Sequence, residues 1–197
     1  ITQSVNFAVV ADLHAHVYGR DNDILIQKIK EQKPDMILVP GDMIVSRYPE
    51  TYETAYQAVK KLTEIAPVYF SNGNHESRVS KVPVMQTEAF LEYENRVRKL
   101  GVHILNNASE EVILHGGKFC ISGLEIPLEC YGKGSYEPLP EHFIQEALGE
   151  AKKDAVQILL AHNPMFAKEY ADWGADITVC GHTHGGLVRI PGIGSVI

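Results

Sequence analysis

Cysteine and positive charge are both scarce in this chain. Its three cysteines, Cys120, Cys130 and Cys180, are an odd number without paired spacing, which predicts neither a disulfide framework nor a thiolate zinc site. The 18 Lys and Arg residues are outnumbered by 25 Asp and Glu residues, for a formal charge of -7. Because nucleic-acid binding usually requires clustered basic residues, this balance argues against DNA or RNA as the partner.

Apolar runs long enough to cross a bilayer are missing as well, and no signal peptide is visible. The chain begins at Ile1 and not at Met, which leaves open a removed leader or membrane anchor. Its location is therefore undecided between the cytoplasm and a membrane surface reached through an anchor outside this chain. Oligomeric state has no signature in the sequence.

The composition is that of one folded domain. With 197 residues, of which 45% are hydrophobic and 22% charged, the chain can bury a core of its own. Short aliphatic runs alternate with longer amphipathic segments, which is the pattern of an α/β fold. We therefore predict a single α/β domain over residues 1–197, with strands at 5–10, 36–39, 68–70, 156–160 and 177–180.

Two amphipathic segments between these strands, residues 21–31 and 51–65, predict crossover helices. Apolar side chains recur there at helical spacing, so one face of each helix should pack against the sheet. The side chains expected to face inward are Ile24, Leu25, Ile29, Ala55, Val59 and Leu62.

The middle of the chain predicts a second, partly antiparallel sheet. Two hairpin-type turn pairs, Asn106-Asn107 and Gly116-Gly117, separate its strands. The strands expected there are residues 102–105, 111–114 and 119–122. Residues 77–83 and 126–140 are predicted to be loops, and residues 187–190 a last strand.

Five polar clusters begin within a few residues of the end of a predicted strand. In open α/β sheets ligands bind outside the carboxyl ends of the strands, so clusters at neighbouring strand ends meet in one crevice. Gly41, Gly73 and Gly181 each precede a polar side chain, and glycine permits the sharp turn that such a site requires. The potential metal ligands in these clusters are Asp12, His14, Asp42, Asn74, His162, His182 and His184.

The ligand types indicate a transition-metal centre. Two carboxylates, one amide and four imidazoles are too rich in nitrogen for calcium or magnesium, and they lack the sulfur of a structural zinc site. Seven ligands are too many for one tetrahedral ion, but they suit two ions about 3.5 to 4 Å apart that share a carboxylate. We expect manganese, iron or zinc.

Together, the blocks DLH, GD, GNHE, LLAHNP and GHTHGG resemble the calcineurin-like metallophosphoesterase family. They span the chain from Asp12 to Gly186, so the resemblance covers nearly all of it. It implies a calcineurin-like sandwich of two mixed β-sheets flanked by helices, in a bacterial subgroup that is often membrane-anchored. It also implies three ligand sets: Asp12, His14 and His184 for one ion, Asn74, His162 and His182 for the other, and Asp42 as the bridge.

The same resemblance implies the reaction. A hydroxide held by the two ions would hydrolyse a phosphate ester or pyrophosphate bond. His75 would face the substrate without ligating and would donate a hydrogen bond or proton to the phosphate or leaving oxygen. The expected substrate is a small phosphorylated molecule, with nucleotide-linked and lipid-linked compounds among the alternatives.

The chain departs from many relatives in two places. Val45 occupies a position where an acidic residue is common, although that residue is not a usual ligand. The sequence also ends soon after the last histidine pair, which suggests either C-terminal strands missing from this chain or a short form. Neither departure removes a predicted ligand.

Two other functions stay open at this point. A phosphoesterase-shaped binding scaffold without turnover would usually have lost residues of the metal blocks, and none is missing here. A nuclease would use the same chemistry, but the sequence has no basic stripe.

Several side chains near the clusters have two interpretations. Glu76 either tunes a ligand or caps the following helix. The residues that either contact substrate or belong to the solvated surface are His16, Arg78, Lys81, Tyr131 and Tyr136. The histidines expected to be structural are His103, His115 and His142.

Overall fold

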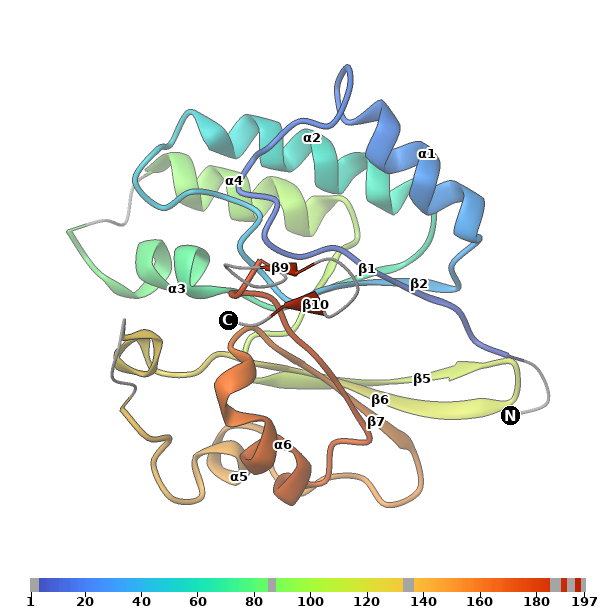
Figure 1. The fold of residues 1–197 in the computed structure, drawn as a ribbon, viewed down its shortest axis with the longest axis vertical. Coiled ribbons are helices and arrows are strands. Elements are labelled where there is room, and N and C mark those ends of the chain that lie inside the picture. Colours follow the sequence, from blue (N-terminus) through green and yellow to red (C-terminus); the bar gives the residue numbers. More distant parts are fainter. Residues whose placement is uncertain (1–3, 85–87, 133–136, 185–188, 191–193, 196–197) are drawn as a thin grey trace.

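Two four-stranded β-sheets face each other in the computed structural model of this chain (Figure 1). The structure describes residues 4–84, 88–132, 137–184, 189–190 and 194–195. The first sheet has the order β1-β2-β3-β4, and each of its strand pairs is parallel. Its strands are β1 (Phe7–Val9), β2 (Met36–Val39), β3 (Val68–Phe70) and β4 (His103–Ile104).

The second sheet has the order β5-β6-β7-β8 and is mixed, since β5 pairs with β6 antiparallel while the other two pairs are parallel. Its strands are β5 (Ala108–Leu114), β6 (Gly117–Leu124), β7 (Val156–Ala161) and β8 (Ile177–Val179). A short antiparallel ribbon joins β9 (Arg189–Ile190) to β10 (Gly194–Ser195).

Helices cover the outer face of each sheet (Figure 1). Over the first sheet lie α1 (Asp23–Gln32), α2 (Thr51–Thr63) and α4 (Glu88–Lys99), and over the second lie α5 (Phe143–Leu148) and α6 (Ala167–Trp173). Shorter elements near the strand ends are α3 (Asn74–Lys81) and the 3-10 turns η1 (Leu128–Tyr131) and η2 (Pro164–Phe166). None of the described helices is both long and apolar enough to cross a bilayer. The predicted sandwich of two sheets flanked by helices is confirmed, but of the two described sheets only the second is mixed, because all strand pairs of the first are parallel.

Strand β2 shows how the core is layered. Met36 and Leu38 pack with residues of the second sheet, such as Ile158, whereas Ile37 and Val39 pack with the helices of the first sheet. This division follows from the alternation of side chains along a strand. Because both faces are covered, β2 is a continuous apolar run.

The predicted turns are only partly right. The β5–β6 hairpin turns at His115 and Gly116, one residue earlier than expected, and both have positive φ, 48° and 76°. That pair of conformations suits the twist of a two-residue hairpin. Asn106-Asn107 is not a hairpin turn, because it connects β4 of the first sheet to β5 of the second.

The prediction of a loop at residues 77–83 is wrong, because α3 runs to Lys81. Ser77 in this segment is buried, and its hydroxyl donates a hydrogen bond to Glu125. Ile24 was also misplaced: it is 53% exposed, and Ile26 lies in the core instead. Helix α1 begins two residues later than predicted, which changes the residues available for its inner face.

Glycine is required where two strand-end loops touch. Gly41 has φ +103°, and a Cβ atom there would lie 2.0 Å from the backbone nitrogen of Gly73. A Cβ atom on Gly73 would lie 2.3 Å from Oδ1 of Asp42. The loops after β2 and β3 therefore approach backbone to backbone, at the positions that precede Asp42 and Asn74.

This contact predicts a specific sensitivity to one methyl group. Gly41→Ala should lower the free energy of unfolding by about 3 kcal/mol, since it adds overlap with a neighbouring backbone to the strain of positive φ. Urea denaturation measures the change. The matched control is Gly101→Ala, because Gly101 has φ +81° and nothing within 4 Å of an added Cβ; it should cost only about 1 kcal/mol. Equal losses in the two variants would contradict a tight contact at Gly41.

Candidate metal centre

The seven predicted ligands all follow strand ends in the structure. Asp12, Asp42 and Asn74 come after β1, β2 and β3 of the first sheet, while His162 and His182 come after β7 and β8 of the second. His14 and His184 each lie two residues beyond a ligand already named. The carboxyl ends of parallel strands in two facing sheets thus bring residues from both halves of the chain together.

One group of ligands joins the two ends of the chain. Asp12, His14 and His184 place ligand atoms within 4.8 Å of one another. The two Nε2 atoms of His14 and His184 are 3.2 Å apart, and their rings stack with centroids 4.9 Å apart. Two nitrogens bound at about 2.1 Å to one tetrahedral ion lie roughly 3.4 Å apart. The observed spacing therefore fits a shared ion.

Asp42 lies between this group and the second sheet. Its Oδ2 is 3.8 Å from Nε2 of His14 and 3.1 Å from Nε2 of His162, and its Oδ1 accepts the backbone N–H of His75 at 2.8 Å. Burial raises the pKa of Asp42, but hydrogen bonding and charge from His162 and His75 bring it below the ordinary value. The side chain is therefore a carboxylate with one oxygen directed between imidazoles.

Two buried ligand atoms lack a hydrogen-bond partner among the described residues: Nε2 of His162 and Oδ1 of Asn74. Nδ1 of His162 is 2.8 Å from the carbonyl oxygen of Pro40, so it donates its proton there and Nε2 carries the lone pair. In this tautomer the lone pair faces the Asp42 carboxylate at 3.1 Å, and either a proton on Nε2 or a metal ion between the two atoms relieves the repulsion. The donor set fits a metal centre by this test.

The carboxylates around His162 also shift its pKa. Burial lowers it, but the carboxylates of Asp42, Asp12 and Glu76 together raise it above the ordinary value. A proton therefore competes with a metal ion for Nε2, and metal binding must displace it.

The second predicted set, Asn74, His162 and His182, is held together less directly. The backbone N–H of His182 bonds to Oδ1 of Asp12 at 2.9 Å. Its ring packs edge-on against the ring of His162, with centroids 5.5 Å apart. Asn74 opens α3, and its side-chain oxygen is the unpartnered atom described above.

His75 lies close to His14 and Asp42, but its ring is held in a different tautomer from that of His14. A ring nitrogen of His75 is within 4.8 Å of ligand atoms of His14 and Asp42, so proximity alone would permit ligation. Its Nδ1, however, accepts the backbone N–H of Ser46 at 2.9 Å, which places the proton of the neutral ring on Nε2. Burial lowers the pKa of His75 below its ordinary value, so the neutral ring is the relevant form. In this tautomer Nε2 carries the proton and is a hydrogen-bond donor.

The sequence left two roles for Glu76, a helix cap or a support for a ligand. In the structure it has both, because it caps α3 and also supports the loop that carries Asp42. Its carboxylate accepts four backbone N–H groups, those of Asp42, Met43, Ile44 and Gly73, at 2.8 to 3.3 Å. Burial and the charge of Asp42 raise the pKa of Glu76 to about 7. The four donors oppose that shift, since they favour the ionised carboxylate.

The other side chains weighed from the sequence have mostly structural partners. Lys81 pairs with buried Glu125 at 3.1 Å, and His16 is exposed and packs on the ring of Tyr18. His103 and His115 contact Glu110 and Asp35 at 2.7 and 2.8 Å. Tyr131 is buried beside the histidines of the site, and Tyr136 lies outside the described residues.

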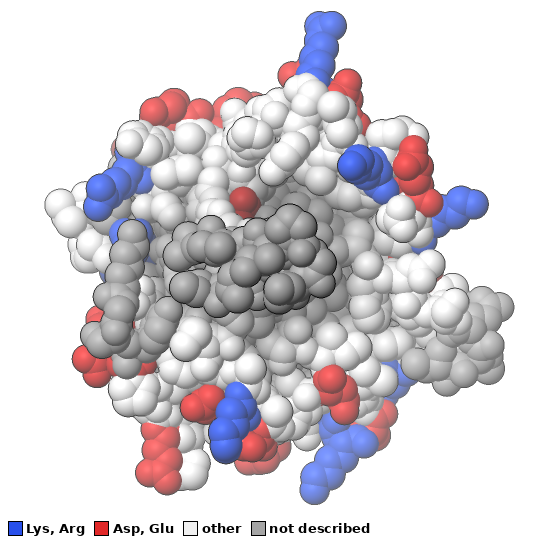
Figure 2. All heavy atoms as spheres, in the orientation of Figure 1, with Lys and Arg blue, Asp and Glu red and all other residues white. Residues whose placement is uncertain are grey.

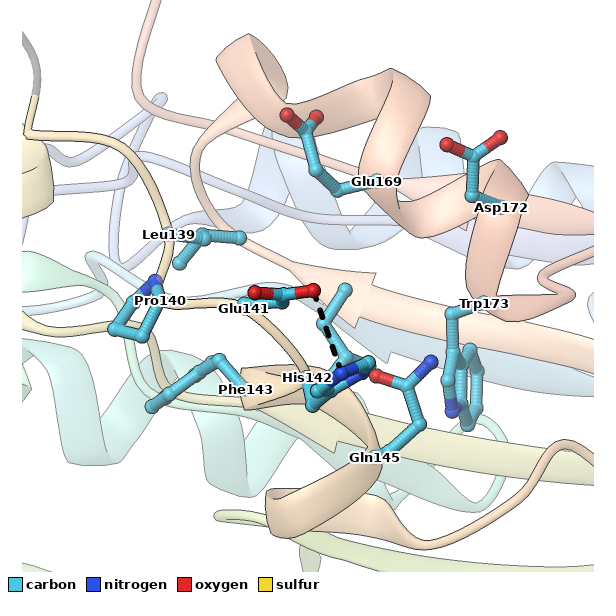
Figure 3. Close-up of a pocket in the computed structure, with 10 residues that line it drawn as sticks. Leu139, Pro140, Glu141, His142, Phe143, Gln145, Glu169, Asp172 and Trp173 are labelled. Atoms are coloured by element: carbon cyan, nitrogen blue, oxygen red, sulfur yellow. Dashed lines mark ion pairs between the residues drawn. The ribbon is translucent and has the colours of Figure 1, made fainter.

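Two hollows show where a ligand has room. A cavity of about 540 Å³ includes Asp12 and His184 in its lining, together with Tyr18 and Pro164. A smaller hollow of about 200 Å³ lies between α5 and α6, where His142 is 3.5 Å from the Glu141 carboxylate (Figure 3). None of the seven predicted ligands is among the described residues that line the smaller hollow. The cavity at the strand ends is the one that belongs to the candidate centre.

Sequence reasoning missed three residues that support the site: Ser46, Asn163 and Glu125. Ser46 contacts Nδ1 of His75 through both its backbone N–H and its hydroxyl, at 2.9 and 3.1 Å. Asn163 follows His162 directly and belongs to the same polar cluster, but the sequence assigned it no role. Glu125 is buried and accepts hydrogen bonds from Asn72 and Ser77, a role that depends on contacts distant in sequence.

Comparison with known proteins identifies the class. A family model described as calcineurin-like phosphoesterase matches residues 5–186, so the chain belongs to this family. The family is one of metal-dependent phosphoesterases, in agreement with the Asp and His groups of the structure.

The sequence identity between this chain and individual relatives is low. The phosphodiesterase YaeI of Escherichia coli is 27% identical over 164 residues, which cover 83% of this chain and 54% of that protein. A bovine transmembrane protein with metallophosphoesterase domain is 25% identical, over 94% of this chain and 41% of its own length. The sulfate thiohydrolase SoxB of Thermus thermophilus shares the fold, with a TM-score of 0.53 and 16% identity over 88% of this chain and 34% of that structure. The chain thus spans about half the length of the curated relatives it matches.

The arrangement around Glu76 predicts the effect of an isosteric change. Glu76→Gln replaces one acceptor oxygen with an N–H donor that faces backbone N–H groups, so the free energy of unfolding should fall by about 2 to 3 kcal/mol. Thermal and urea denaturation measure it. The control is Glu110→Gln at a partly exposed position on β5, which should cost less than about 0.5 kcal/mol. An unchanged free energy of unfolding in Glu76→Gln would mean that the four N–H groups do not need an ionised acceptor.

Proposed function

We propose that this chain is a hydrolase of phosphate esters or phosphoanhydrides that works through two divalent metal ions. One observation carries the proposal: Asp42 directs a single oxygen between Nε2 of His14 and Nε2 of His162. A carboxylate placed between two imidazoles from different sheets suits a bridging ligand. Asp12, His14 and His184 would then hold one ion, and Asn74, His162 and His182 the other.

Two such ions supply Lewis acidity and an activated water at neutral pH. The protein side chains set the geometry around them. His162 and His14 present Nε2, because their Nδ1 atoms face the carbonyl oxygens of Pro40 and Ile44 at 2.8 and 3.3 Å. Both rings are thereby held in the tautomer that ligation needs.

His75 would contact the substrate. With Nδ1 occupied by Ser46, its Nε2–H can donate a hydrogen bond to a phosphoryl oxygen or to the leaving oxygen as charge develops there. This refines the role implied by the resemblance, since a neutral ring is a hydrogen-bond donor first. The hydrogen bond from the backbone N–H of His75 to Oδ1 of Asp42 fixes the distance between His75 and the proposed bridging carboxylate.

A small phosphorylated molecule remains the substrate we propose. On the face shown in Figure 2, basic side chains are scattered among acidic ones around the rim and form no stripe in its described part. This distribution gives no support to a nucleic-acid backbone as the partner. Membrane association stays a prediction.

The decisive experiment is metal removal and return. The chelated protein should not hydrolyse aryl phosphate monoesters or diesters, and Mn²⁺ should restore the rate, because the proposed nucleophile depends on metal-bound water. Asp42→Asn should abolish the restored rate, whereas His16→Ala, on the exposed loop beside the site, should retain it. Absence of hydrolysis with Mn²⁺, Fe²⁺ and Zn²⁺ alike would rule out the proposed activity for this chain.

The role of His75 has its own test. His75→Ala should lower kcat roughly 100-fold to 1,000-fold by removing one preorganised donor, while the metal content stays as in the unaltered chain. Steady-state kinetics and metal analysis of the same preparations separate the two effects. A variant that loses metal together with rate would show that His75 is a ligand after all.

A further inference from the structure

His182 differs from His14 and His162 in what orients its ring. His14 and His162 are aligned by backbone carbonyl oxygens, as described above. In the described part of the chain no group hydrogen bonds to the ring nitrogens of His182; only its backbone N–H is held, by Asp12. Its backbone is also strained, with φ +69°. Among the described residues, the contacts that direct this imidazole are ring contacts.

Two aromatic rings supply that constraint. The ring of Tyr131 packs edge-to-face on His182, with centroids 5.2 Å apart and planes at 71°. The ring of His162 contacts the same imidazole at 5.5 Å and 64°, and Tyr131 also lies 6.1 Å from His162. Edge-to-face pairs at these distances are favourable and directional. The imidazole of His182 therefore packs against both rings.

Tyr131 is itself firmly placed. It is buried, with 9% of its surface exposed, at the end of η1. The fully buried Asn163, next to His162, donates a hydrogen bond from Nδ2 to the carbonyl oxygen of Cys130 at 3.0 Å. The ligand block at the end of β7 thus anchors the turn that carries Tyr131.

We infer that Tyr131 is a positioning residue for one metal ion of the centre, acting through the ring of His182. The inference rests on the proposed two-metal function. The aromatic ring carries the effect, since the contacts with His182 and His162 are made by the ring. Partners that orient a ligand typically contribute 10-fold to 100-fold in metal affinity.

The test measures how many Mn²⁺ ions bind and how tightly each one binds. Metal-free protein is titrated with Mn²⁺ by calorimetry, and electron paramagnetic resonance reports the signal of two coupled ions. Tyr131→Leu should weaken one of the two Mn²⁺ sites by roughly 10-fold to 100-fold and delay the coupled signal, while the other site keeps its affinity. Tyr131→Phe retains the ring and should bind both ions as the unaltered chain does.

Phe166→Leu is the control for packing alone. Phe166 is 5% exposed and belongs to the same apolar cluster as Tyr131, so its truncation should lower the melting temperature without changing the ratio of the two affinities. Unchanged affinities in Tyr131→Leu, or equal weakening of both sites, would overturn the inference, as would loss of one site in Tyr131→Phe. Failure of the unaltered chain to bind two Mn²⁺ ions would instead overturn the proposed two-metal function itself.

Discussion

The candidate centre depends on the hydrogen bonds that the buried carboxylate of Glu76 accepts. It accepts N–H groups from the loop after β2 and from the turn that opens α3. Those N–H groups would otherwise be buried without acceptors, at a cost of about 1 to 3 kcal/mol each. By satisfying them, Glu76 allows Gly41 and Gly73 to meet backbone to backbone, and this contact sets Asp42 beside Asn74 and His75.

The centre also concentrates strain and like charge. Five of the seven predicted ligands have positive φ: Asp12, His14, Asp42, His182 and His184. Each such residue costs on the order of 1 kcal/mol, although Asp and His tolerate the conformation better than most. Three carboxylates crowd around His162 and raise its pKa. A fold bears such costs where function requires the geometry, and bound cations would offset the repulsion.

Local pattern predicted most of the elements near the site. The bounds of β2 and β3 were predicted correctly, because both are short apolar runs buried on both faces. Polar segments were harder: the part of α3 from Ser77 on was predicted as a loop, since its buried Ser77 finds its partner, Glu125, far away in the sequence. Asn106 and Asn107 have turn composition, but only their side-chain bonds to Asn72 and Glu125 show that they link two sheets.

The sequence by itself determined which side chains are available: seven candidate oxygen and nitrogen ligands at strand ends, with glycines where two loops must touch. It could do so because ligand type and strand periodicity are local properties of the chain. Only the tertiary structure decided that Nδ1 of His162 faces a carbonyl oxygen, that Nδ1 of His75 accepts an N–H group, and that Tyr131 packs on His182. Those facts depend on backbone N–H and carbonyl groups and on ring contacts between residues far apart in sequence, whose directions are set only when the two sheets pack together.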